Sequence, residues 1–217
     1  MDSSTSPIPD WLVDALREAA PARRQRVLVL DSVPATVLGH FVHAVGGEGE
    51  VESLATPDAA ASFFRAARRF DLVFAAPAVP SPAGPEPCLA AAHAALRPGG
   101  RMLLDLPAAS WSDDLWRLLP LLSELGVALP PGVEEDPVRH AAEGLHLRDL
   151  QVTARTCLHQ LADADELVDL AMRATRAMPD AERTDADGLR IAVHELLARR
   201  PPPLQTVLRR VRLHARR

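Results

Sequence analysis

The sequence predicts an α/β protein built on one mostly parallel sheet of about six strands, with helices on both faces. Short apolar runs alternate along the chain with segments long enough to form crossover helices. Two of these runs, "FDLVFAAPAV" and "RMLLDLPA", are apolar almost throughout, which is typical of strands that are buried on both faces. Helices that connect parallel strands in this way are expected to cross over with right-handed geometry.

The first elements are predicted from an amphipathic segment and a buried run. Residues 10–20, "DWLVDALREAA", carry apolar side chains on one helical face, and they fall within an N-terminal helical segment of residues 1–24. A first strand is expected at 27–30 because all four of its residues are apolar. The helix expected at 35–45 ends at Gly46-Gly47, a common stop signal.

Proline and glycine mark the boundaries of the next elements. Pro57 is placed to begin a helix, and Pro98-Gly99-Gly100 is placed to turn the chain. The elements expected here are, in order, a strand at 50–55, a helix from 57 to 69, a strand at 70–79, a helix at 88–97, a strand at 101–108 and a helix at 110–126.

The last third of the chain has a different pattern. Residues 145–161 are expected to be extended, because part of the segment has apolar side chains at every second position. Two segments with Asp-rich starts predict a helical insertion at 163–200. A terminal strand at 204–217 is predicted from the order of elements, not from periodicity.

Two stretches resemble class I S-adenosylmethionine-dependent methyltransferases, in particular the small-molecule type related to ubiquinone biosynthesis. "FDLVFAAPAV" is similar to the fourth strand of that family, and "AAAHAALRPGGRMLLDLP" is similar to its next helix, turn and fifth strand. The resemblance implies a three-layer Rossmann-like methyltransferase fold for residues 25–217.

The first strand departs from that family's cofactor motif. The motif places an acid and three glycines in the turn, and here the acid falls on Val29 while the glycines fall on Asp31, Val33 and Ala35. Glycine permits backbone conformations and close approaches that a side chain hinders. Asp31 would also put a negative charge near the carboxylate of the ligand. The resemblance assigns five positions to the cofactor pocket, namely Asp31, Ser32, Pro34, Ala55 and Ala75.

Two further losses are independent of the turn. The acid that normally binds the ribose hydroxyls at the end of the second strand is replaced by Ala55. The chain between Ala55 and Phe70 has room for one helix only, so one βα unit of the family is expected to be missing.

These losses favour a methyltransferase-fold protein with an eroded S-adenosylmethionine pocket. Such a pseudoenzyme would be a non-catalytic or repurposed binding protein, with no cofactor expected and with a protein or a small molecule as its partner. The alternative is an active S-adenosylmethionine-dependent methyltransferase that acts on a small molecule and binds its cofactor atypically.

Few side chains point to other chemistry. His140 is the candidate general base, in a 127–146 loop expected to reach the carboxyl edge of the sheet. His40 and His43 share a helix face but lack an evident third ligand, so no metal is expected.

Charge and composition bear on the partners. A net charge of −5 argues against extensive nucleic-acid binding. From Arg199 onward the chain nevertheless carries seven arginines and no acid, which suits either a solvated strand face or contact with a nucleic acid or an acidic partner. A cytoplasmic protein is expected, because the sequence has neither a membrane-spanning apolar run nor a secretion signal.

Overall fold

The computed structural model describes residues 8, 10–30, 33, 35–54, 69–78, 80–81, 83–109, 132–161 and 204–217, with scattered positions between 166 and 195. The helices predicted to begin at Pro57 and at Ser110 lie outside the described residues. So do four of the predicted pocket positions, namely Asp31, Ser32, Pro34 and Ala55.

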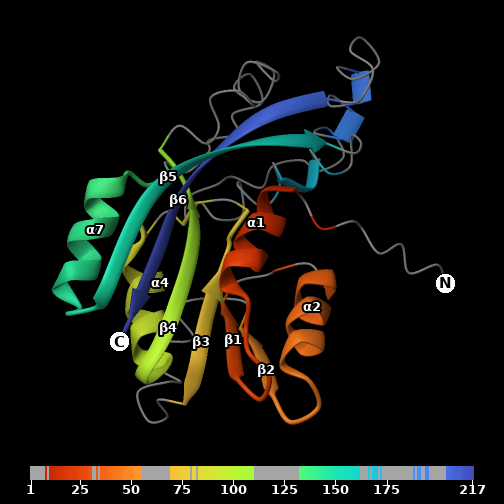
Figure 1. The fold of residues 1–217 in the computed structure, drawn as a ribbon. Helices are drawn as coiled ribbons and strands as arrows, with labels where there is room; N and C mark the ends of the chain where they lie inside the picture. Colours follow the sequence, from red (N-terminus) through yellow and green to blue (C-terminus); the bar gives the residue numbers. More distant parts are fainter. Residues whose placement is uncertain are drawn as a thin grey trace.

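Six strands form one sheet in the order β2-β1-β3-β4-β6-β5, which confirms the predicted α/β architecture (Figure 1). β1 pairs in parallel with β2 and β3, and β3 pairs in parallel with β4. β6 is antiparallel to both of its neighbours, β4 and β5. The strands are β1 (Arg26–Leu30), β2 (Glu50–Leu54), β3 (Phe70–Ala75), β4 (Leu96–Pro107), β5 (Arg148–Leu161) and β6 (Leu204–Arg216).

Helices cover both faces of the sheet, as the pattern predicts. α1 (Asp10–Ala19) and α2 (Ala35–Val45) pack on one face, and α4 (Glu86–Ala95) and α7 (Glu135–Gly144) pack on the other. Strand residues divide by alternation, so that Val27 and Val29 of β1 face α1 and α2, while Leu28 and Leu30 face α4 and α7. This two-sided burial explains why β1 and β3 are apolar at almost every position. None of the described helices has the length and apolar character needed to cross a membrane.

Two strand boundaries differ from the sequence prediction by four residues or more. β3 ends at Ala75, four residues earlier than predicted. β4 begins at Leu96 and includes the predicted Pro98-Gly99-Gly100 turn, which appears as an irregularity in the pairing with β3 and a positive φ at Gly99. The described positions of the predicted 163–200 insertion are helical.

The predicted 127–146 loop is wrong over residues 135–144, which form α7. Acidic residues occupy the first turn of this helix, where their negative charge interacts favourably with the positive end of the helix dipole. Only Val138 and Ala142, one helical turn apart, are buried. A helix with two buried positions gives a weak periodic signal, and this is why the sequence suggested a loop.

We expect Gly132→Ala to lower the free energy of unfolding by about 1–3 kcal/mol, through steric overlap. A Cβ at Gly132 would overlap the backbone carbonyl of Ala108, where the segment before α7 makes a parallel bridge between Ala108 and Val133. The matched control is Gly144→Ala, because a Cβ there meets open space. Urea unfolding should place the Gly144 variant at or slightly above the wild-type midpoint. Equal midpoints for the two variants would contradict this account of Gly132.

Candidate functional site

The carboxyl ends of the parallel strands define the candidate site. β1, β2 and β3 end at Leu30, Leu54 and Ala75, on the same edge of the sheet. The chain passes from β2 to β3 across β1, so the sheet reverses its order at this point. In open α/β sheets, ligands bind outside the carboxyl ends at such a switch point.

The connection from β1 to α2 is short, since β1 ends at Leu30 and α2 begins at Ala35. Val33 is its one described residue. Val33 is partly buried and packs against the hydrophobic cluster formed by α1, α2 and the sheet. Its side chain therefore contributes to the core at a position where the family motif has a glycine.

The described side chains at this edge are mostly apolar. A sulfonium nucleoside carries a charged amino-acid portion and ribose hydroxyls, which require polar partners when they are taken out of water. The last residues of β1, β2 and β3 are apolar, and Ala75 is completely buried in the core that faces α4. A single hydroxyl, Thr36 Oγ1 in the first turn of α2, is buried there without a hydrogen-bond partner.

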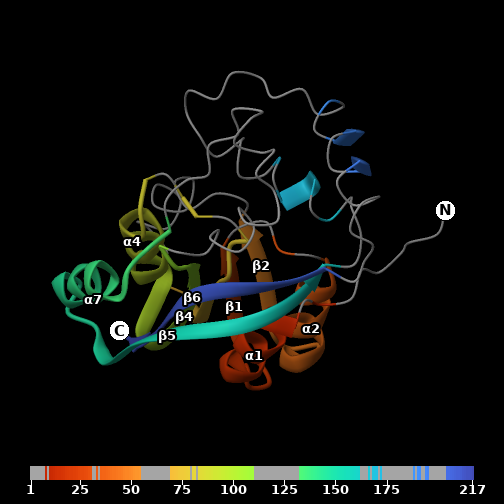
Figure 2. The same cartoon turned by 90° about the horizontal axis from the view of Figure 1, so that it is seen from above.

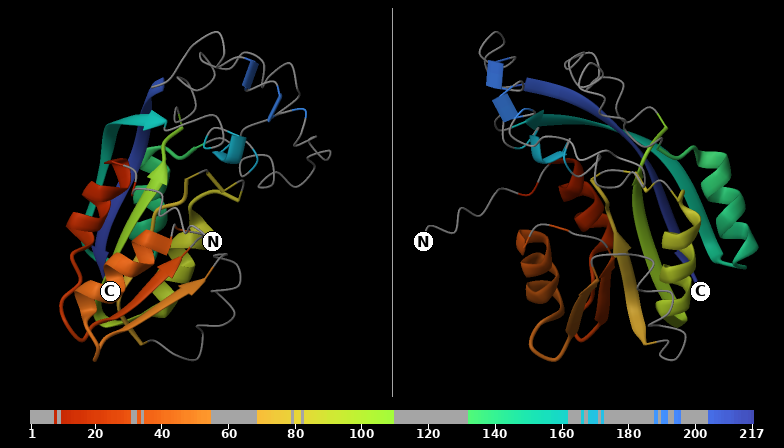
Figure 3. Two further views of the ribbon diagram at one scale, coloured as in Figure 1. Left: turned by 90° about the vertical axis from the view of Figure 1, so that its right-hand side faces the viewer. Right: turned by 180° about the vertical axis from the view of Figure 1, so that it is seen from behind.

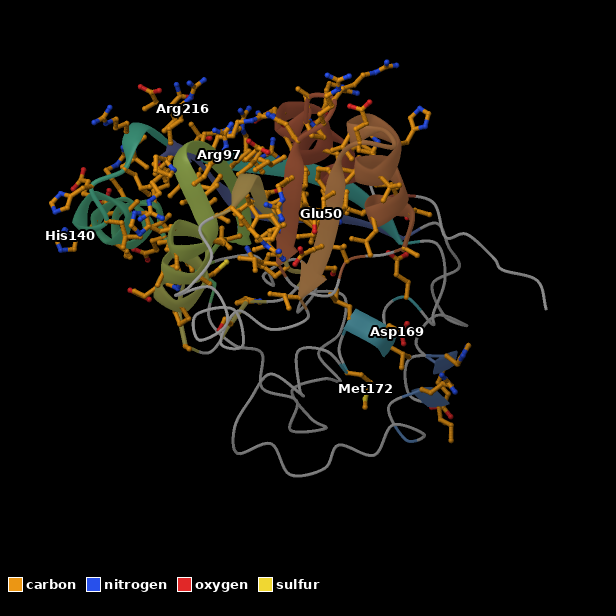
Figure 4. All side chains as sticks on the ribbon, turned by 90° about the horizontal axis from the view of Figure 1, so that it is seen from below. Glu50, Arg97, His140, Asp169, Met172 and Arg216 are labelled. Carbon is orange, nitrogen blue, oxygen red and sulfur yellow. The ribbon has the colours of Figure 1, made fainter. Side chains whose placement is uncertain are left out.

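The predicted catalytic candidate lies elsewhere. His140 is exposed on α7, and Figure 4 shows it on the outer side of this helix, at the margin of the molecule. The structure does not bring it together with Ala75, the one predicted pocket position that is described. His40 and His43 are exposed on α2. Over the part of the chain that the structure describes, no three potential ligands are grouped closely enough to hold a metal ion.

The most unusual chemistry lies on the face of the sheet beneath α1, in a group that we call the buried ion cluster: Asp105 on β4 with Arg210 and Arg212 on β6. Asp105 is completely buried, and each arginine side chain is 2% exposed. Arg212 donates to Asp105 Oδ2 at 3.1 Å, and Arg210 donates to the Asp105 carbonyl. Burial lowers the pKa of Arg210, and the charge of Asp105 opposes that effect.

Glu18, near the end of α1, contacts the buried ion cluster through Arg212 and is itself partly exposed to solvent. Its carboxylate lies 2.7 Å from Arg212, 2.8 Å from His214 Nε2 and 3.5 Å from Arg155 on β5. Partial burial raises the pKa of Glu18, but the charge of Arg212, the hydrogen bond with His214 and the charge of Arg155 outweigh this effect, so the pKa lies below its usual value. The end of α1 is thus held on the sheet by ionic contacts.

Two further contacts fasten the same helix. The ring of Trp11 covers the guanidinium of Arg210, with 4.2 Å between Cζ and the ring centroid. Arg101 donates to the carbonyl of Ala20, just beyond the helix, at 2.7 Å. Helix α1 is therefore tied to β4 and β6 at both of its ends.

The interpretation of the C-terminal arginines as a solvated strand face is wrong for Arg210 and Arg212, which are buried. Alternation along β6 sends Val211 and Leu213 toward α4 and sends the two arginines toward α1. Asp105 is the one sequence feature that could have predicted these buried arginines, because an acid inside an apolar strand needs a buried partner. Arg216 pairs with Asp149 at 3.5 Å, and Arg217 donates to the carbonyl oxygens of His93 and Leu96.

Comparison with known proteins supports the fold alone. No family model matches the sequence, and no curated protein matches it. A protein from Bacillus halodurans, provisionally assigned as a methyltransferase, superposes with a TM-score of 0.51 at 14% identity, over 94% of this chain and 97% of its own. The YcgJ protein of Bacillus subtilis gives a TM-score of 0.54 at 12% identity, over 94% and 98% of the two chains.

A third similar structure is a protein of echinomycin biosynthesis, described with the conversion of a disulfide bond into a thioacetal group. It gives a TM-score of 0.50 at 14% identity, over 99% of this chain and 83% of its own. The sheet order and these likenesses together identify a class I methyltransferase fold.

Proposed function

We propose that this chain is a methyltransferase-fold protein that does not bind S-adenosylmethionine in the usual way and acts as a non-catalytic binding or partner protein. The observation that carries the proposal is the packing of Val33 into the hydrophobic cluster at a glycine position of the cofactor turn. The absence of glycine between Val27 and Leu38 points the same way.

The physical reason for the proposal is the cost of burying the charged groups of the nucleoside without polar partners. Removing an amino or carboxylate group from water without a partner costs several kcal/mol, which exceeds what contacts with small apolar residues return. The described edge of the sheet offers Leu30, Leu54 and Ala75, which have no polar side-chain atom. Van der Waals contact with these three side chains would not hold the charged part of the nucleoside at this edge.

The scaffold gives a second reason. The buried ion cluster and the two hydrophobic clusters are made of this chain's own side chains, and they join the six strands to one another and to α1. Such a fold can persist after its cofactor site is lost, and it can then offer its surface to a protein or a small molecule.

Isothermal titration calorimetry with S-adenosylmethionine and with S-adenosylhomocysteine tests the proposal. We expect no saturable heat from either compound, while an active methyltransferase of the same fold, titrated in parallel, should give a normal isotherm. A dissociation constant of about 10 µM or tighter would overturn the proposal. Transfer of a labelled methyl group to a small molecule would then establish the alternative, an active enzyme with atypical cofactor binding.

A further inference from the structure

The outer edge of β5 is the longest open strand edge of the described sheet. β5 is the terminal strand and pairs with β6 alone among the described strands. Figure 2 shows it as the outermost strand of the sheet, beside β6. An edge of this kind presents unpaired backbone groups that can template pairing with another strand.

The hydrogen-bond pattern shows which residues of β5 face outward. Ala108 N donates to Arg209 O, and Arg217 N donates to Gly100 O, so the odd-numbered residues of β6 direct their backbone groups toward β4. The even-numbered residues of β6 then face β5, where the register pairs His214 with Gln151. By the same alternation, the even-numbered residues of β5 present their N–H and C=O groups to the outside.

The first part of this edge is protected. A pairing irregularity lies between Arg148 and Gln151, and such irregularities disturb strand addition. Arg139 of α7 donates to the carbonyl of Val152 at 3.3 Å, so this outward group is already occupied. The opposite edge of the described sheet, β2, is five residues long and includes Glu50 and Glu52. Short, charged strands are a common protection against edge pairing.

No described residue protects the second part, residues 154–160, in this way. Ala154, Thr156 and Leu158 are all exposed, and the exposed fraction of Leu158 is 57%. The stretch contains no proline, and its one acidic or basic side chain other than histidine is Arg155, which pairs with Glu18. The contrast between the two halves of one strand indicates that the second half is available for pairing.

Most of this half of β5, from Thr156 onward, belongs to an extension in which β5 and β6 are the only described strands. β4 ends at Pro107, which pairs with Arg210, whereas β5 and β6 remain paired as far as Leu161 and Leu204. Figure 3 shows the two strands running past the ends of the others. A two-stranded ribbon is marginally stable in water, and further strands stabilise it.

We propose that residues 154–160 of β5 pair antiparallel with the same residues of a second copy of this chain, about a two-fold axis at Cys157. This register pairs residue 154 with 160 and residue 156 with 158, so every open outward position is used. An axis at 156 would need the carbonyl of Val152, which Arg139 occupies. An axis at 155 would place two Arg155 side chains opposite each other. The dimer joins two sheets into one and closes the β5 edge of each copy.

The test is a mass measurement by light scattering and sedimentation over a range of concentrations. We expect the wild type to shift from a 23.4 kDa monomer to a species of twice that mass as its concentration rises. Thr156→Pro removes an outward N–H without removing a bond to β6, and an edge strand tolerates proline at such a position. Leu158→Lys adds a charge to the open edge. Each variant should raise the dissociation constant at least about tenfold.

The matched control is Val42→Lys, which changes an equally exposed apolar residue on α2 and should leave the dimer intact. Hydrogen exchange measured by NMR should show the amides of residues 154, 156, 158 and 160 gaining protection with concentration in the wild type and in the Val42 variant only. A wild type that stays monomeric, or a dimer that survives both edge substitutions, would overturn the proposal. The outcome is independent of S-adenosylmethionine binding.

Discussion

Replacing Asp105 with alanine is expected to lower the free energy of unfolding by about 3–5 kcal/mol, because it leaves the buried guanidinium of Arg210 without a carboxylate among the described residues and leaves Arg212 with Glu18 alone. Arg210 and Arg212 are nearly inaccessible to water, and each lies against Asp105. Arginine does not lose its charge at ordinary pH, so the cost cannot be relieved by deprotonation. Urea unfolding followed by circular dichroism measures the loss directly.

Asp14→Ala is the matched control, because Asp14 makes an ion pair with Arg17 in which both side chains are well exposed. Exposed pairs contribute at most about 1 kcal/mol, so this variant should unfold close to the wild type. A triple variant, with Asp105→Leu, Arg210→Met and Arg212→Leu, should recover most of the stability that the single variant loses, since it removes all three buried charges together. A loss below about 1 kcal/mol in Asp105→Ala would contradict the interpretation of the cluster.

The fold could be predicted because its strands are buried on both faces. Such strands have continuous apolar sequences, which makes them easy to find. The predicted bounds, 27–30 and 70–79, agree within four residues with the observed β1 (Arg26–Leu30) and β3 (Phe70–Ala75). The terminal strand β6 was placed by the order of elements, since arginines interrupt its apolar pattern. Its two buried arginines make sense only after β4 and β6 are paired and Asp105 is seen opposite Arg212.

The candidate site was harder to predict, because its chemistry depends on contacts between distant segments. The departure from the glycine motif at Val33 is visible in the sequence, but its packing against the hydrophobic cluster needs α1 and α2 in place. The open half of β5 could not be predicted either. Its period-two pattern predicts an extended segment but does not show that Ala154 and Thr156 are exposed. Protection by Arg139 depends on α7, in a segment that the sequence suggested was a loop.

Trp11→Ala is expected to cost about 3–5 kcal/mol, the usual loss when a large buried side chain is removed. Trp11 is 6% exposed, and its ring covers the guanidinium of Arg210. The substitution therefore opens a cavity beside a buried charge and removes a cation–π contact. Trp11→Phe keeps an aromatic face over the guanidinium and should retain more than half of the lost stability, as urea unfolding would show.

A double-mutant cycle that combines Trp11→Ala with Asp105→Ala separates the contribution of packing from that of charge in the stability loss of Trp11→Ala. If Trp11 acts partly by shielding the ion cluster, its removal lets water reach Arg210 and lessens the need for Asp105. The two losses should then sum to more than the loss in the double variant, with a coupling of about 0.5–3 kcal/mol. Additive losses would mean that Trp11 stabilises the protein by packing alone and does not shield the buried ion cluster from water.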